Sequence, residues 1–251
     1  MGELGRIEIL SDLPALVRHT AEWLTAAALA AKSPFRVSLS GGSTPKTLYE
    51  LLASDRFRNR FPWQRAHWYW GDERFVPYDH PESNYRMTRE AMLSKVPVPP
   101  ENVHPVPTDG EPDDAARRYE RTLQAAYGAT TIDPARPLFD VTLLGLGADG
   151  HTASLLPDEP VLEERKRWVA AVSHGRPEIR ITMTYPAIES SRRVAFLVAG
   201  AEKASIFSAI STGKSHVPAA RVRPVGELYW FVDRAAADDE RIPRRAELRA
   251  S

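Results

Sequence analysis

A near-continuous apolar run at residues 138–144 leads directly into a glycine turn, and this junction constrains the fold more than any other stretch of the chain. Such a run predicts a strand buried on both faces, which is typical of a parallel sheet covered by helices. The turn at residues 145–150 has the spacing G-x-G-x-x-G, which favours a dinucleotide-binding loop. Asp149 and His151 stand in or beside the same turn and favour acid–base catalysis instead. The function depends on which interpretation holds.

Neither of the two nucleotide-binding patterns in the chain has the context that it requires. A dinucleotide fingerprint should be followed, about 20 residues on, by an acidic residue at the end of the next strand. That strand is predicted at residues 168–173 and contains no acid. Gly213-Lys-Ser215 ends like a phosphate-binding P-loop, but Ser208 stands where its first glycine should be, after a helical rather than a strand pattern. We therefore expect no nucleotide cofactor.

Strand and helix patterns alternate along most of the chain. After a first short strand within residues 1–10, apolar residues at helical spacing predict a helix over residues 13–31, capped by Ser11 or Asp12. A strand at 35–40 and a glycine turn precede a helix at 45–52, with Thr44 as its expected cap and Pro45 as its first residue. Further strands are expected at 66–70, 168–172, 179–184, 193–198 and 228–232, and further helices at 84–93, 113–127 and 201–210.

This alternation predicts an α/β fold in one domain, residues 1–233, with a mostly parallel twisted sheet and helices on both faces. Trp68, Tyr69 and Trp70 fill one strand, and without basic clusters beside them they are expected to pack in the core rather than to stack on bases. Residues 234–251 are first alanine-rich and then charged, which predicts a tail on the surface.

The composition argues against several classes of function. The chain has 33 basic and 33 acidic residues, and a net charge of zero disfavours a broad surface for nucleic acid. Because there is no cysteine, disulfides, thiolate metal sites and a cysteine nucleophile are excluded, and a reduced, cytoplasmic compartment is expected. No apolar run reaches the roughly 20 residues that a membrane helix needs, and the first residues do not read as a signal peptide. The histidines lack metal-ligand spacing, so no metal is expected.

The segment from residue 40 to residue 45, Ser-Gly-Gly-Ser-Thr-Pro, is a candidate anion site because it follows a strand and opens a helix. Unpaired backbone N–H groups and the helix dipole attract an anion at such a place. The candidate phosphate-binding residues are Ser40, Gly41, Gly42, Ser43 and Thr44. On composition alone, an ordinary capped turn is an equally good interpretation.

Other polar residues fall near predicted strand ends, where open α/β sheets bind ligands. Asp72 and Arg74 follow the aromatic strand, although a solvated turn is the commoner role for such residues. Arg180 and Lys203 are isolated cations that could face the same edge or form ordinary surface ion pairs. His151 could act as a general base or cap a helix that begins at Thr152.

Several ordered motifs together resemble the 6-phosphogluconolactonase family over nearly the whole chain. The motifs are Ser40-Gly-Gly-Ser-Thr-Pro45, Gly71-Asp-Glu-Arg-Phe-Val-Pro77, Ser83-Asn-Tyr85, Gly145-Leu-Gly-Ala-Asp-Gly-His-Thr-Ala-Ser-Leu-Leu-Pro157, Arg180-Ile-Thr-Met-Thr184, Val198-Ala-Gly-Ala-Glu-Lys203 and Pro218-Ala-Ala-Arg221. The resemblance implies the fold shared with glucosamine-6-phosphate deaminase. It also implies hydrolysis of 6-phospho-D-glucono-1,5-lactone, in the oxidative pentose phosphate pathway, without metal or nucleotide. The expected partner is this small phosphosugar lactone, and the expected assembly is a monomer or small homo-oligomer.

In a mechanism consistent with this resemblance, His151 deprotonates the attacking water and Asp149 orients the imidazole or the substrate. Backbone donors of the glycine turn would steady the developing oxyanion. The glycine loop at residues 40–44, with Lys203 and Arg180, would hold the phosphate, and Arg74 would neutralise charge on the substrate or product.

Two alternatives stay open at this level. A glucosamine-6-phosphate deaminase or isomerase also pairs a glycine phosphate loop with an Asp-Gly-His turn, and its enolising aspartate would fall on Asp72. A non-catalytic sugar-phosphate-binding effector domain is the second alternative. The residues before the first glycine loop offer only one helix for a DNA-binding unit, and the chain keeps both Asp149 and His151, so catalysis is favoured.

Overall fold

The fold is known from a computed structural model, which describes residues 4–31 and 34–237. Its strands and α-helices, in chain order, are β1 (Arg6–Leu10), α1 (Leu13–Ala30), β2 (Phe35–Leu39), α2 (Ser43–Leu52), α3 (Asp55–Arg58), β3 (Ala66–Trp70), β4 (Asp72–Arg74), α4 (Asn84–Ala91), β5 (Val103–His104), α5 (Pro112–Tyr127), β6 (Val141–Gly145), β7 (Val169–Val172), β8 (Arg180–Met183), α6 (Tyr185–Glu189), β9 (Arg193–Val198), α7 (Ala204–Ser211), α8 (Pro218–Arg221), β10 (Glu227–Asp233) and α9 (Arg234–Ala237). The predicted alternation of strands and helices is confirmed.

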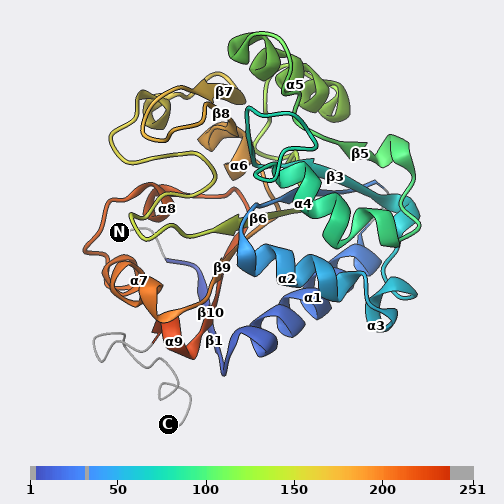
Figure 1. Ribbon diagram of the computed structural model, residues 1–251. Coiled ribbons are helices and arrows are strands. Elements are labelled where there is room, and N and C mark those ends of the chain that lie inside the picture. Colours follow the sequence, from blue (N-terminus) through green and yellow to red (C-terminus); the bar gives the residue numbers. More distant parts are fainter. Residues whose placement is uncertain (1–3, 32–33, 238–251) are drawn as a thin grey trace.

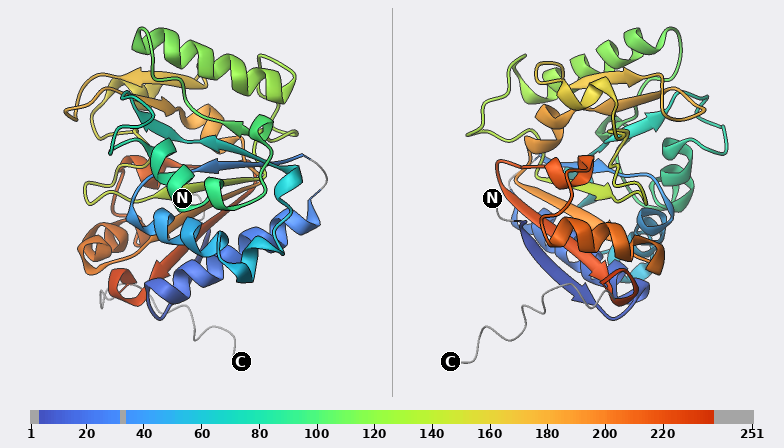
Figure 2. Two further views of the ribbon diagram at one scale, coloured as in Figure 1. Left: turned by 45° about the vertical axis from the view of Figure 1, so that its right-hand side comes forward. Right: turned by 90° about the vertical axis from the view of Figure 1, so that its left-hand side faces the viewer.

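Seven parallel strands form the main sheet in the order β1-β10-β9-β6-β2-β3-β5. Helices α1, α2 and α4 lie on one side of this sheet, whereas α5, α6 and the hairpin β7–β8 lie on the other (Figures 1 and 2). The chain moves from β2 to β3 in one direction and from β6 to β9 in the opposite direction. The order therefore reverses between β2 and β6, and open α/β sheets bind ligands outside the carboxyl ends of strands at such a switch point.

Strands β4, β8 and β7 do not join the main sheet, which corrects the expectation of a single sheet. They form a separate antiparallel sheet in the order β4-β8-β7. The segment from β7 to β8 is too short for the helical crossover that parallel neighbours need, so the two strands pair as a hairpin. Helix α5 packs on β7 and β8. This small sheet extends over the edge of the main sheet at which the glycine loops lie (Figure 2).

Two predicted helix starts differ from the observed ones. Helix α2 begins at Ser43, so Thr44 is not its cap, and Gly42 takes the N-cap position with a φ of 102°. Glycine adopts this conformation without the steric cost that other residues bear, and the helix therefore starts directly after the glycine pair. No helix begins at Thr152, because that residue forms an isolated β-bridge with Leu155. The interpretation of His151 as a helix cap is therefore wrong.

Other local predictions are confirmed. Asp12 caps α1, its side chain accepting a hydrogen bond of 2.8 Å from the backbone N–H of Ala15. The aromatic residues of β3 are core residues, since Trp68 and Trp70 are fully buried and Tyr69 is 1% exposed. The aromatic strand is therefore used for packing, as its sequence predicted.

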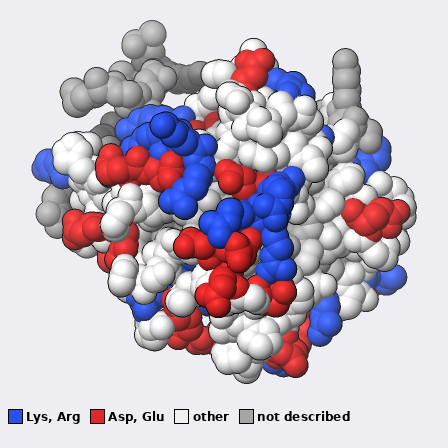
Figure 3. Space-filling view, turned by 90° about the horizontal axis from the view of Figure 1, so that it is seen from above, with Lys and Arg blue, Asp and Glu red and all other residues white. Residues whose placement is uncertain are grey.

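The packed part of the chain extends beyond the boundary expected at Asp233. Residues 234–237 form α9, in which Ala236 is fully buried. The remaining residues of the expected tail, 238–251, lie outside the described part of the chain. Over the described ranges, no helix has both the length and the apolar character that crossing a bilayer requires. Acidic and basic side chains are interspersed on the face shown in Figure 3, as the zero net charge would lead one to expect.

Candidate active site

A cavity of about 240 Å³ lies at the switch point, outside the carboxyl ends of β2, β6 and β9. The sequence-predicted residues that line it are Ser40, Gly41, Gly42, Ser43, Thr44, Asp72, Arg74, His151, Arg180 and Lys203. Asp149 does not line the cavity but contacts His151. The structure thus gathers in one place residues that lie up to 163 positions apart, from residue 40 to residue 203.

The glycine loop after β2 is held rigidly at its base. The buried hydroxyl of Tyr49 donates to the backbone oxygen of Ser40 at 2.7 Å and accepts from its N–H at 3.0 Å. The loop then enters α2, whose first two residues, Ser43 and Thr44, line the cavity. Free N–H groups at a helix N-terminus, together with the helix dipole, favour an anion.

Two arginines stand directly opposite each other on the paired strands β4 and β8. Arg74 is the register partner of Arg180, and both line the cavity. Like charges in such a cross-strand pair destabilise a sheet. The Nε atom of Arg180 is buried without a hydrogen-bond partner, and burial lowers the pKa of this guanidinium, with the nearby Arg74 acting in the same direction. Glu178 forms an ion pair with Arg180 at 3.8 Å, so the alternative of an ion pair holds in part, but both guanidinium groups still line the cavity and favour an anionic ligand.

Arg74 is oriented by Asn84, a residue to which the sequence gave no role although it stands in the Ser83-Asn-Tyr85 motif. The Nη1 atom of Arg74 donates to Oδ1 of Asn84 at 2.6 Å and to the backbone oxygen of Glu82 at 3.0 Å. These partners are neutral oxygens, so they fix the guanidinium without cancelling its charge. Asn84 also lines the cavity.

The carboxylate of Glu73 connects the backbone segments that carry Arg74 and Asn84. It is buried and accepts backbone hydrogen bonds of 2.8 Å from Arg74, Asn84 and Tyr85. Burial raises the pKa of Glu73, and these backbone hydrogen bonds oppose the rise. Glu73 thereby ties β4 to the first turn of α4 and holds Arg74 and Asn84 in one unit.

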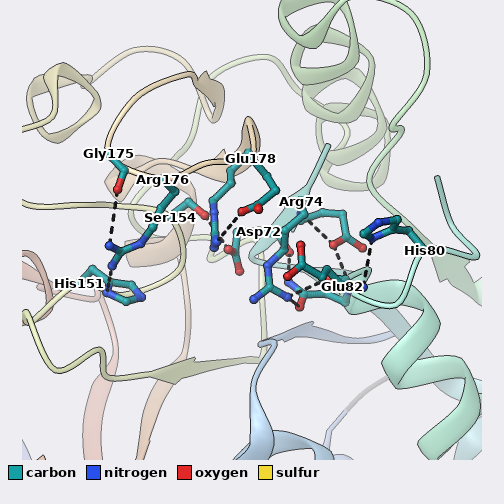
Figure 4. A network of polar contacts seen from close by, with 12 residues as sticks. Asp72, Arg74, His80, Glu82, His151, Ser154, Gly175, Arg176 and Glu178 are labelled. Carbon is teal, nitrogen blue, oxygen red and sulfur yellow. Dashed lines mark hydrogen bonds and ion pairs between the residues drawn. The ribbon is translucent and has the colours of Figure 1, made fainter. Parts of the chain in front are cut away.

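Asp72 and Lys203 line the cavity from two different elements, β4 and the short 3-10 helix after β9. Asp72 is 6% exposed, and its Oδ2 accepts a hydrogen bond of 2.6 Å from the hydroxyl of Ser154 (Figure 4). Lys203 lies in the short 3-10 helix after β9 and has no ion pair within the described ranges. The same ranges contain no cluster of three histidine, aspartate or glutamate side chains that could hold a metal ion.

His151 and Asp149 form the tightest polar pair at the cavity. The Nδ1 atom of His151 lies 2.5 Å from Oδ1 of Asp149. Partial burial raises the pKa of Asp149, but hydrogen bonds from His151 and Arg176 outweigh it and lower the pKa to about 2. The carboxylate is therefore ionised at neutral pH and acts as the hydrogen-bond acceptor for Nδ1 of His151. A neutral imidazole that donates from Nδ1 can accept a proton.

The glycine turn makes room for this pair. A Cβ atom on Gly147 would lie 2.0 Å from Nδ1 of His151 and 2.6 Å from Oδ1 of Asp149, which no side chain allows. The turn also bonds to itself: the N–H of Gly147 donates to the backbone oxygen of His151 at 2.9 Å, and that of Gly150 to Gly147 at 3.0 Å. These two donors are engaged, so the expectation that the glycine turn supplies the oxyanion donors is wrong for Gly147 and Gly150.

Arg176 is a further residue of this cluster that the sequence did not indicate. It lies in the loop between β7 and β8, and its Nη2 donates to Oδ2 of Asp149 at 2.7 Å. The same atom lies 3.3 Å from Nδ1 of His151 (Figure 4). Only the antiparallel pairing of β7 with β8 brings this loop over the turn that holds Asp149 and His151, and the sequence pattern did not predict that pairing.

An open parallel α/β sheet with a cationic cavity at its switch point and a histidine–carboxylate pair on the rim defines a class of enzymes for small anionic substrates. The family model described as glucosamine-6-phosphate isomerases/6-phosphogluconolactonase matches residues 11–230. The chain belongs to this family.

Relatives and solved structures agree with this assignment. The 6-phosphogluconolactonase of Nostoc sp. is 40% identical over 239 residues, which make up 92% of this chain and 96% of the relative. The crystal structure of 6-phosphogluconolactonase from Thermotoga maritima matches with a TM-score of 0.77 at 31% identity, over 91% of this chain and 99% of the other. A monomeric glucosamine-6-phosphate deaminase matches with a TM-score of 0.78 at 21% identity, over 92% and 98%, which shows a shared fold. The predicted resemblance and fold are confirmed.

Proposed function

We propose that this protein hydrolyses 6-phospho-D-glucono-1,5-lactone to 6-phospho-D-gluconate. The observation that carries the proposal is the union, in one cavity, of an anion-binding half and a proton-accepting half. Arg74, Arg180 and the first turn of α2 make up the former, and His151 with Asp149 the latter. Hydrolysis of a phosphorylated lactone requires both a group that binds the phosphate and a group that accepts a proton. The Nostoc and Thermotoga relatives named above are 6-phosphogluconolactonases, which supports this substrate.

In the proposed reaction, Nε2 of His151 takes a proton from a water molecule, whose oxygen then attacks the lactone carbonyl carbon. The bond between this carbon and the ring oxygen breaks, and His151 returns the proton to the ring oxygen as it becomes a hydroxyl. Asp149 holds the imidazole in the required tautomer through the 2.5 Å contact with Nδ1. A general base of this kind contributes about 10²–10⁴ in rate.

The phosphate is assigned to the glycine loop, with its residues Ser40, Gly41, Gly42, Ser43 and Thr44, and to Lys203 and Arg180. Hydrogen bonds to charged groups contribute about 1.5–3 kcal/mol each, so a few of them anchor a sugar phosphate. Arg74 is assigned to the negative charge on the reacting end of the substrate, including the oxyanion. The N–H groups of Gly147 and Gly150 already donate hydrogen bonds within the turn, so a side chain is assigned to stabilise the oxyanion. Asp72, fixed by Ser154, is assigned to a substrate hydroxyl.

All of these groups come from one chain, so the proposal requires no second copy and is compatible with a monomer or a small homo-oligomer. It also requires no metal or nucleotide. The absence of cysteine supports a reducing compartment such as the cytoplasm.

The test is lactone hydrolysis by the wild-type protein and by His151→Ala, after circular dichroism has shown that the variant is folded. We expect kcat to fall by about 10²–10⁴ with little change in KM. Undiminished turnover would remove His151 from the mechanism. Equal kcat/KM for the phosphorylated lactone and for unphosphorylated gluconolactone would overturn the phosphate assignment. Ammonia release from glucosamine 6-phosphate, without lactone turnover, would favour the deaminase alternative.

A further inference from the structure

The three charged groups Arg176, Asp149 and His151 form a chain in which the carboxylate uses one oxygen for each neighbour. Oδ1 of Asp149 contacts Nδ1 of His151 at 2.5 Å, and Oδ2 accepts from Nη2 of Arg176 at 2.7 Å. Figure 4 shows Arg176 reaching from the β7–β8 loop toward the imidazole. Arg176 does not line the cavity, so it reaches the reacting atoms only through these two residues.

We propose that Arg176 is a positioning residue for the reaction, which clamps Asp149 and keeps the imidazole of His151 uncharged, as a general base must be. The inference rests on the proposed function, because it assigns Arg176 a role only if His151 is the base. The guanidinium of Arg176 holds the second oxygen of the carboxylate that orients the imidazole.

The electrostatic argument concerns the charge that the imidazole experiences. A carboxylate at hydrogen-bond distance stabilises the protonated imidazolium form of His151. It therefore opposes formation of the neutral imidazole, which is the form that can act as a base at neutral pH. The guanidinium of Arg176, with Nη2 3.3 Å from Nδ1, supplies an opposing positive charge. With the imidazole neutral, Arg176 and Asp149 sum to zero charge. Removing Arg176 leaves a net negative charge beside the ring, which favours protonation.

The surrounding charged groups do not replace Arg176. Those that line the cavity or stand on the neighbouring loops are Asp72 and Arg74 on β4, Arg180 on β8, Lys203 after β9, Glu159 beside Gly175, and His174 and Glu178 on the β7–β8 loop, with His216 before α8. Within the described ranges, Asp149 forms ion pairs with His151 and Arg176 and with no other side chain. The net charge beside the imidazole of His151 therefore depends on Arg176, which neutralises the carboxylate of Asp149.

The experiment compares the pH dependence of kcat/KM for the phosphorylated lactone in the full-length wild type, Arg176→Gln and Arg176→Lys, with spontaneous hydrolysis subtracted. For Arg176→Gln we expect the acid limb to move to higher pH by about one unit, so that activity near about pH 6 falls roughly tenfold and activity near about pH 8 falls less. KM should change by less than about twofold, because Arg176 does not touch the cavity. Arg176→Lys, which keeps the charge, should restore most of the profile.

The matched control is Arg167→Gln. Arg167 pairs with Glu164 on a neighbouring loop and does not line the cavity, so its loss should leave the profile unchanged. An Arg176→Gln profile parallel to the wild type would overturn the proposal. An equal loss in Arg167→Gln would also overturn it, because the effect would then be a general one of surface charge.

A double-mutant cycle separates action through Asp149 from direct contact with the substrate. In an Asp149→Asn background, Arg176→Gln should add less than about a twofold further loss, because the carboxylate that it clamps is gone. A full additional loss, with a raised KM, would show that Arg176 binds substrate and would overturn the positioning role. Because His151→Ala is measured separately, failure of this inference leaves the proposed function testable by itself.

Discussion

The proposed anion-binding side of the cavity and its proposed catalytic side rest on different kinds of structure. Arg74 and Arg180 stand on paired strands, and the glycine loop enters a ten-residue helix of nearly three turns, so backbone hydrogen bonds fix their positions. His151, Asp149 and Arg176 stand on irregular loops and are fixed by contacts between side chains. Ala153, next to the catalytic turn, even adopts a positive φ of 48°, which residues other than glycine seldom do.

This difference separates two jobs that a hydrolase must do. A binding subsite requires charged groups in fixed positions, and the backbone hydrogen bonds of helices and strands hold them there. A general base must also be held in one tautomer and protonation state, which side-chain partners can tune and a backbone alone cannot. Substitutions on the two sides should therefore affect different kinetic parameters, and the following predictions test that separation in order of decreasing effect.

The largest effect is expected for Gly147→Ala on the catalytic side. A Cβ there meets Nδ1 of His151 at 2.0 Å, so the imidazole must move, and a displacement of this size costs about a hundredfold in kcat. KM should change little. Steady-state kinetics with the phosphorylated lactone measure both. Gly128→Ala is the control, because it adds a Cβ at a strained helix end in open space and should lower stability by about 1 kcal/mol without lowering kcat.

Arg180→Gln tests the binding side. Losing one charge-assisted contact with the phosphate should lower kcat/KM by about 10-fold to 100-fold, mainly through KM. The stability of the ligand-free protein should change by less than about 1 kcal/mol, because relief of the like-charge pair with Arg74 is offset by loss of the 3.8 Å ion pair with Glu178. Urea unfolding measures the second effect. A variant with an unchanged KM would contradict the anion-site interpretation.

Glu73→Gln tests the support of the binding side. The amide keeps one acceptor oxygen but places an NH₂ group among three backbone N–H donors, so the free energy of unfolding should fall by about 1–3 kcal/mol. The kcat/KM should fall because Arg74, which is assigned to the reacting end of the substrate, and Asn84 lose their common anchor, while the pH profile of kcat should keep its shape. A changed acid limb would instead tie Glu73 to the catalytic side.

The smallest effect is expected far from the cavity, at the pair His67 and His104. Their Nδ1 and Nε2 atoms lie 3.1 Å apart, and burial, with neighbouring positive charge, lowers the pKa of His67 and lowers that of His104 to about 4. In the unfolded chain these histidines bind protons more readily than in the folded protein. The free energy of unfolding therefore has its full value above about pH 6.5 and decreases as the pH falls toward about 4. Because both rings are partly exposed, the loss is about 1 kcal/mol.

Urea unfolding at several pH values checks this prediction. His104→Phe should flatten the pH dependence, whereas the same replacement of the exposed His80 should not. Neither change should move the acid limb of catalysis. A moved limb would show that the catalytic side responds to charge far outside its own loops.

Much of the binding side could be predicted from sequence because its residues are local to regular elements. The strand–glycine–helix pattern placed Ser40 and Thr44 correctly at a helix N-terminus, although it misjudged the helix start by two residues because glycine takes the cap position itself. Arg180 was named as an isolated cation and Arg74 as a charged residue after the aromatic strand, and their opposition across β4 and β8 came only from the structure. Asn84 was passed over because an uncharged amide at the start of a helix carries no signal of charge or periodicity.

The sequence by itself determined the parallel α/β architecture, the core role of the aromatic strand and the presence of an Asp-Gly-His turn, because apolar periodicity and glycine spacing are properties of neighbouring residues. Only the tertiary structure decided that His151 faces a carboxylate clamped by Arg176 and that ten predicted residues share one cavity. The physical reason is that these contacts join chain segments that pair through the sheet edge and the β7–β8 hairpin. Their geometry depends on long-range packing, which no local pattern records.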